Sequence, residues 1–136
     1  NSFLMSFKTI IFDLDGVLYL GDSIINGAPE TIEKIKKMNK SVFFLTNSGT
    51  SSREDKAIKL RNKGFLVENS EVFTSAYGVG HYIASIKSNP TVYIVGEGSL
   101  REQLASFGIF STTENPDFVV VSLDREISYS RLSIAF

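Results

Sequence analysis

Residues 10–19 read IIFDLDGVLY, and this stretch decides the fold class of the chain. Its first three residues form a short apolar run, which is typical of a strand buried on both faces of a parallel sheet. Asp13 and Asp15 follow where that strand ends, and residues two apart in an extended chain point to the same side. We therefore expect two carboxylates to converge at the carboxyl end of a buried strand.

Further apolar runs of the same kind recur along the chain, at residues 42–45, 92–95 and 118–121. Helix signals fill the stretches between them. Pro29 fits the first turn of a helix that runs to about Lys40, and Ser51 with Glu54 forms a capping-box pattern for a second helix. That helix is expected to end at Gly64. Two more helices are expected, over residues 75–87 and 99–107.

Strands that alternate with helices predict an α/β fold with a parallel, doubly wound, Rossmann-like sheet. The softest boundary is the polar segment 87–90, which ends in Pro90 just before a new strand. It suggests two α/β parts, residues 1–88 and 89–136. Aromatic residues are expected in the core, among them Tyr77 and Phe110.

Composition excludes several classes of function. The 136 residues are 43% hydrophobic and 21% charged, which suits an ordinary globular domain. The formal net charge of −1 argues against nucleic acid or anionic lipid as a partner. The basic clusters at residues 34–40 and 53–63 contain interleaved acidic residues, so we interpret both as solvated helix faces. The chain has no cysteine and one histidine, His81, which excludes thiolate and histidine-rich metal sites.

No apolar run approaches the roughly 20 residues of a membrane-spanning helix, and the chain does not open with a secretory signal pattern. A cytoplasmic location is the resulting prediction. Residues 128–136 have an amphipathic pattern that stops without a cap or a polar tail. This pattern predicts a chain that is cut short.

Two carboxylates at a buried strand end repel each other unless a cation, a shared proton or backbone donors stabilise them. Mg²⁺ fits best, because it prefers oxygen ligands and commonly joins carboxylates to phosphate. Gly16 allows close approach of an anion to the backbone. Simple turn chemistry of Asp13 and Asp15 remains an alternative, whereas a calcium loop fails because Val17 stands where the next oxygen ligand is needed.

A second candidate loop follows the run at residues 42–45. Thr46, Asn47 and Ser48 supply a hydroxyl, an amide and backbone N–H groups just before a helix N-terminus, where an anion is favoured. The competing interpretation is an ordinary capped helix start. Both loops follow consecutive parallel strands, so together they make the stronger case for a phosphate site: one brings carboxylates and the other brings anion donors.

The segment DLDGVLY at residues 13–19 resembles the first motif of the haloacid dehalogenase superfamily, and FLTN at residues 44–47 resembles the second. The segments that follow narrow the resemblance to the branch of nitrophenyl phosphatases and of phosphoglycolate and pyridoxal phosphate phosphatases. They are GAPE at 27–30, SRE at 52–54, YIVGEG at 93–98 and PDFVVV at 116–121. The resemblance covers residues 7–135.

The resemblance implies a Mg²⁺-dependent phosphatase for small phosphomonoesters. Asp13 would be the nucleophile that forms an aspartyl-phosphate, and Asp15 would be the general acid and base. The Asp13 carboxylate and the Asp15 backbone carbonyl would hold the metal. Thr46 and Asn47 would bind the phosphoryl oxygens, and Ser48 and the Gly16 amide are weaker candidates for the same role. Residues 89–136 would begin an inserted α/β cap that selects substrates and often mediates homodimerisation.

The sequence departs from the family pattern in two respects. Ser122 stands where this branch usually has glycine. The third motif, which contributes a lysine, and the fourth, which contributes further acidic residues, are not found. We therefore expect this chain alone to be inactive and the parent protein to be an enzyme. The alternative is a non-catalytic phosphate-binding or interaction module on the same fold. A receiver-like signalling domain fits less well, because its acceptor aspartate follows the third strand.

Overall fold

The computed structural model describes residues 7–14, 27–46, 51–95, 99–112 and 115–122. Within these ranges, five strands form one sheet in the order β3-β2-β1-β5-β4, and every neighbouring pair is parallel. The strands are β1 (Thr9–Asp13), β2 (Ser41–Leu45), β3 (Val72–Phe73), β4 (Val92–Val95) and β5 (Phe118–Ser122). The predicted parallel α/β sheet is confirmed, and β3 is a short strand that the sequence patterns did not indicate.

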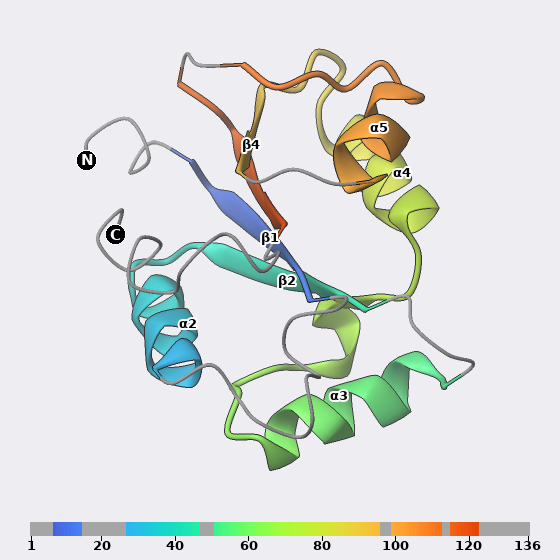
Figure 1. Ribbon diagram of the computed structural model, residues 1–136. Coiled ribbons are helices and arrows are strands. Elements are labelled where there is room, and N and C mark those ends of the chain that lie inside the picture. The colour runs from blue at the N-terminus through green and yellow to red at the C-terminus, as the bar shows by residue number, and fades with distance from the viewer. Residues whose placement is uncertain (1–6, 15–26, 47–50, 96–98, 113–114, 123–136) are drawn as a thin grey trace.

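Helices cover both faces of the sheet. In Figure 1, α2 and α3 lie on one side of the strands, and α4 and α5 lie on the other. The helices are α2 (Ala28–Lys37), α3 (Arg53–Asn62), α4 (Ala76–Ile86) and α5 (Ser99–Ala105), with a 3₁₀ helix at Asn69–Glu71. All four predicted helices are present, and their ends lie within three residues of those expected.

The alternation of side chains along β1 explains why helices cover both faces of the sheet. Ile10 and Phe12 pack with Ile32 of α2 in one core, whereas Ile11 packs with Val79 of α4 in the other. All three β1 residues are at most 1% exposed. A strand with both faces buried needs a continuous apolar run, and β1 has one.

The start of α3 lies one residue later than the capping-box pattern predicts. Ser52, not Ser51, is the N-cap, and its hydroxyl accepts from the Asp55 N–H at 3.1 Å. The stop at Gly64 is confirmed. Gly64 has φ +96, a conformation that glycine adopts without steric cost, and the next N–H, from Phe65, donates to Leu60 O and closes the helix.

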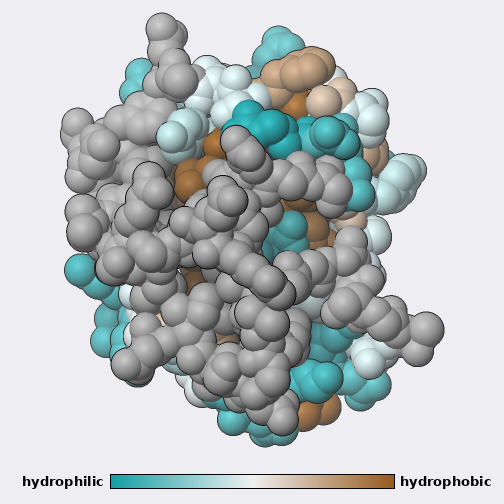
Figure 2. All heavy atoms as spheres, viewed as in Figure 1, coloured by the Kyte–Doolittle hydropathy of each residue, from teal (hydrophilic) through white to brown (hydrophobic). Residues whose placement is uncertain are grey.

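The sheet runs across the predicted boundary between residues 88 and 89, because β5 pairs with β1 and β4 pairs with β5. The assignment of residues 89–136 to a cap stays a prediction. The expectation that Tyr77 and Phe110 belong to the core is wrong, since they are 68% and 69% exposed. On the face seen in Figure 2, the described residues in view include both hydrophobic and hydrophilic ones. Among the described residues, no helix is long and apolar enough to cross a membrane.

Candidate functional site

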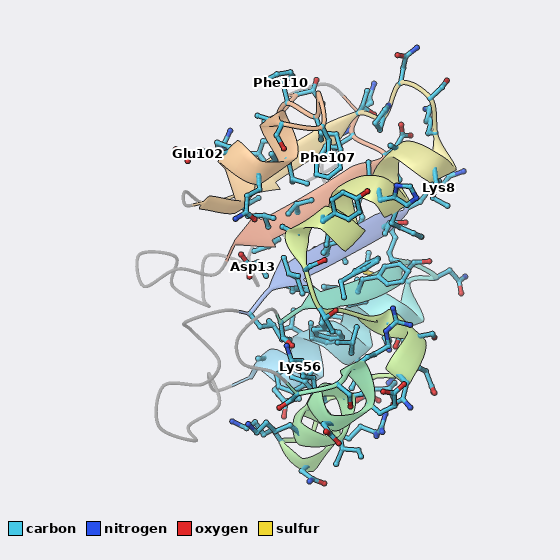
Figure 3. The ribbon with its side chains drawn as sticks, turned by 90° about the vertical axis from the view of Figure 1, so that its right-hand side faces the viewer. Lys8, Asp13, Lys56, Glu102, Phe107 and Phe110 are labelled. Atoms are coloured by element: carbon cyan, nitrogen blue, oxygen red, sulfur yellow. The ribbon has the colours of Figure 1, made fainter. Side chains whose placement is uncertain are left out.

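The candidate site lies at the carboxyl end of β1, the central strand of the sheet. Asp13 is the last residue of β1 and lies opposite Leu45 of β2 on one side and Ser122 of β5 on the other. Figure 3 shows Asp13 and Lys8 at opposite ends of β1. Ligands of open α/β sheets bind outside the carboxyl ends of the strands, so Asp13 occupies the position at which such a ligand is expected.

Asp13 is half-buried, and its backbone is fixed by strands on both sides. The N–H of the next residue, Leu14, donates to Leu45 O at 3.0 Å and continues the β1–β2 ladder. Leu14 is itself 1% exposed, so the chain leaves the strand through the core. The other predicted residues of this loop, Asp15 and Gly16, lie outside the described residues.

Thr46 lies one residue past the end of β2, at the same edge as Asp13. It is 1% exposed, and its N–H donates to Phe73 O at the end of β3, at 3.0 Å. Its hydroxyl oxygen is buried and has no hydrogen-bond partner within the described part of the chain. A buried unpaired hydroxyl costs free energy and calls for an explanation, such as a ligand that supplies the bond. Asn47 and Ser48, the other predicted anion donors, lie outside the described residues.

Lys56 also belongs to this edge, although no sequence pattern indicated it. It stands in the first turn of α3, is 5% exposed, and donates from Nζ to Thr46 O at 2.5 Å. Figure 3 shows Lys56 away from Lys8, toward the side of the molecule on which Asp13 lies.

The interpretation of residues 53–63 as a solvated face is therefore wrong for Lys56. It is correct for three other basic residues of α3, which are exposed: Arg53, Lys59 and Arg61. One available signal was the spacing of Lys56 from Leu60, because residues four apart share a helix face. Ala57 and Leu60 form the buried side of α3, and both are fully buried.

The described residues at this edge supply only part of a binding site for a cation that prefers oxygen ligands. Asp13 offers a carboxylate, the ligand type that Mg²⁺ prefers. Among the described residues, no group of three or more histidine, cysteine, aspartate or glutamate side chains is close enough to hold a metal ion. Within the described part of the chain, Asp13 therefore does not belong to such a group.

Two described side chains have shifted pKa values. Hydrogen bonds from Lys87 and from the Thr91 hydroxyl hold the pKa of Asp117 below its usual value. Asp117 precedes β5, at the amino end of the sheet. Burial raises the pKa of Tyr82 on α4. The shift at Asp117 therefore does not mark the candidate site.

Known proteins match this chain over most of its length. The sequence model of the family described as haloacid dehalogenase-like hydrolase matches residues 10–110. An acid sugar phosphatase of Staphylococcus haemolyticus is 33% identical over 133 residues, which is 97% of this chain and 51% of that protein. The chloroplastic phosphoglycolate phosphatase 1A of Arabidopsis thaliana is 35% identical over 114 residues, 82% of this chain and 31% of that protein.

Among solved structures, the 4-nitrophenylphosphatase of Thermotoga maritima is 32% identical, with a TM-score of 0.49. The match covers 98% of this chain and 51% of that one. The chain thus spans about half the length, or less, of the relatives it matches.

Proposed function

This chain belongs to the family of haloacid dehalogenase-like hydrolases, and from that premise we propose that it carries the nucleophile and the phosphate loop of a magnesium-dependent phosphatase. The substrate would be a small phosphomonoester. The main support is the placement of Asp13 and Thr46 at one edge of the sheet, where the buried Thr46 hydroxyl lacks a partner among the described residues.

In the proposed reaction, an Asp13 carboxylate oxygen attacks phosphorus as the bond between phosphorus and the leaving oxygen breaks. Asp15 gives a proton to that leaving oxygen. Water, deprotonated by Asp15, then hydrolyses the aspartyl-phosphate and releases inorganic phosphate, which restores the Asp13 carboxylate. Thr46 and Asn47 bind phosphoryl oxygens throughout, assisted by Ser48 and the Gly16 amide.

Mg²⁺ is the proposed cofactor. The Asp13 carboxylate and the Asp15 backbone carbonyl are oxygen donors of the kind that this ion takes, and the substrate phosphate would supply another. When bound, the ion reduces the repulsion between the attacking carboxylate and the phosphate anion.

The names of the relatives support the substrate class. They are phosphatases named for sugar phosphates, phosphoglycolate and 4-nitrophenyl phosphate. We extend to this protein only what these substrates share, a phosphate ester on a small molecule. The same proposal includes a cytoplasmic location and a homodimer formed through a cap that begins near residue 89.

The test uses the longest natural protein that contains this chain, called here the long form. We expect the long form to hydrolyse p-nitrophenyl phosphate with Mg²⁺, and the Asp13→Asn variant to lose at least about 10³-fold in kcat. The 136-residue chain assayed alone should have little or no activity. An active Asp13→Asn variant would show that the nucleophile is assigned wrongly.

The alternative is a non-catalytic module that binds phosphate and does not turn it over. It predicts that the long form binds inorganic phosphate, yet releases no p-nitrophenol under any metal condition. Calorimetric titration with phosphate beside the phosphatase assay separates the two functions.

A further inference from the structure

Lys56 is the charged side chain most deeply buried in the described part of the chain. It is 5% exposed, and the other buried polar residues of that part are Thr9 and Thr46. Lysine is among the residues least often buried without a partner, because its ammonium group is strongly hydrated. A second partly buried lysine, Lys36, illustrates the usual solution, since its Nζ lies 2.8 Å from a carboxylate oxygen of Glu71.

The partner that the structure gives Lys56 is neutral. Its Nζ donates to Thr46 O at 2.5 Å, and an ammonium group has three such donors. Within the described residues, the ion pairs involve Lys36, Lys37 and Lys87, and none involves Lys56. The positive charge of Lys56 is therefore not balanced by a described carboxylate.

The same bond fixes Thr46. Its N–H is held by Phe73 O of β3, and its carbonyl is held by Lys56 of α3. Both backbone groups of Thr46 are thus tied to neighbouring elements, while its buried hydroxyl has no described partner. Thr46 therefore has a hydroxyl group without a described hydrogen-bond partner, and the ammonium group of Lys56 lies beside this residue.

A buried charge beside a buried unpaired hydroxyl is costly for stability alone. An anion bound at this edge would offset both costs, because it would accept from the hydroxyl and attract the ammonium group. A purely structural role would be filled as well by an apolar side chain of similar length, since apolar replacement of buried charged groups is often neutral or stabilising.

We propose that Lys56 is a positioning residue for the phosphoryl group: it holds the Thr46 backbone and places a positive charge beside the phosphate site. This inference rests on the proposed phosphatase function and adds a residue from α3 to the two loops already named. Lys56 acts through Thr46 and through its charge.

The experiment compares Lys56→Met with the wild-type long form. The measured quantities are kcat, KM for p-nitrophenyl phosphate, the inhibition constant of inorganic phosphate, and Tm. We expect KM and the phosphate inhibition constant to rise together by about tenfold or more, as loss of a charged partner does, with Tm unchanged or higher. Lys59→Met is the matched control, because Lys59 lies on the same helix and is exposed.

Values of KM and of the phosphate inhibition constant within twofold of wild type in Lys56→Met would overturn the inference. If Lys56→Met does not fold, Lys56→Gln serves instead, because it keeps an N–H donor and removes the charge; the same weaker phosphate inhibition is expected. If the wild type has no phosphatase activity, the proposed function fails by itself. Calorimetric titration of wild type and Lys56→Met with inorganic phosphate then tests Lys56, and equal affinities would refute its role.

Discussion

Asp13 lies directly opposite Leu45 in the ladder between β1 and β2, and the Leu14 N–H donates to Leu45 O at 3.0 Å. Thr46, the residue after Leu45, therefore lies one step beyond Asp13 at the same edge of the sheet. A slip of one residue in this register would move Asp13 and the apolar side chains of β1 to the opposite faces. The buried faces of β1 thus fix the site as well as the fold.

Replacing Thr46 by valine should separate stability from function. The Thr46 hydroxyl is buried and unpaired within the described residues, so a methyl group in its place should raise the free energy of unfolding by about 1 kcal/mol. The same change removes a donor to phosphate, and the phosphate inhibition constant should rise by about tenfold or more. Urea denaturation and phosphatase inhibition in the long form measure the two effects.

Thr91→Val is the matched control, because the Thr91 hydroxyl has hydrogen-bond partners in the structure. The Thr91 hydroxyl donates to Asp117 Oδ2 at 2.8 Å and accepts from the Asp117 N–H at 3.0 Å. Its loss should lower the free energy of unfolding by about 1 kcal/mol and leave phosphate inhibition unchanged. If the two substitutions changed the free energy of unfolding equally, the interpretation of the Thr46 hydroxyl as a ligand-binding group would be contradicted.

Metal removal should abolish turnover by the long form. Treatment with EDTA is expected to stop p-nitrophenyl phosphate hydrolysis, and added Mg²⁺ to restore it, because the carboxylate of Asp13 and the phosphate repel each other without a cation. Ca²⁺ should restore little activity, since it takes six to eight oxygen ligands at longer distances. Full activity in EDTA would rule out the metal.

Gly80→Ala should destabilise the contact between α4 and the segment after α5. A Cβ at Gly80 would lie 2.6 Å from Cδ2 of the Phe107 ring, so the ring must move, at a cost of about 1–3 kcal/mol. Gly78→Ala is the control on the same helix. Its Cβ would meet its nearest atoms at 3.5 Å, and the higher helix propensity of alanine should stabilise the fold by up to about 1 kcal/mol. Opposite signs in Tm are the expected outcome.

The pair Lys87 and Asp117 should make stability sensitive to acid. The two side chains lie 2.7 Å apart, and the hydrogen bond from Lys87 holds the pKa of Asp117 below the ordinary value of 3.8. A lowered pKa in the folded state stabilises the fold above the unfolded-state pKa, and the contribution is lost as the pH falls through the folded-state value.

Asp117→Asn should therefore cost up to about 1 kcal/mol at neutral pH, as expected for a half-exposed ion pair. The difference from wild type should shrink between about pH 5 and pH 2. Urea denaturation of both proteins across this range provides the measurement. A difference that grows toward acid pH would mean that the sign of the shift is wrong.

The sequence by itself determined the fold class. The continuous apolar run before Asp13 could belong only to a strand buried on both faces or to a buried helix, and the helix signals between such runs selected the parallel sheet. It also placed Asp13 and Thr46 at the ends of consecutive strands, because parallel strands present their carboxyl ends at one edge. Local signals fixed the helix ends within a few residues, but misplaced the N-cap of α3 by one, since Ser51 and Ser52 offer the same hydroxyl.

Only the tertiary structure decided which charges and hydroxyls are buried. Lys56 belongs to a run of charged residues that a local pattern assigns to solvent, and its burial depends on the packing of α3 against the sheet. The unpaired state of the Thr46 hydroxyl likewise depends on partners from β3 and α3, which are distant in sequence. Periodicity reports which face of an element is apolar. The packing of the helices and strands against one another determines which polar side chains are buried with that face.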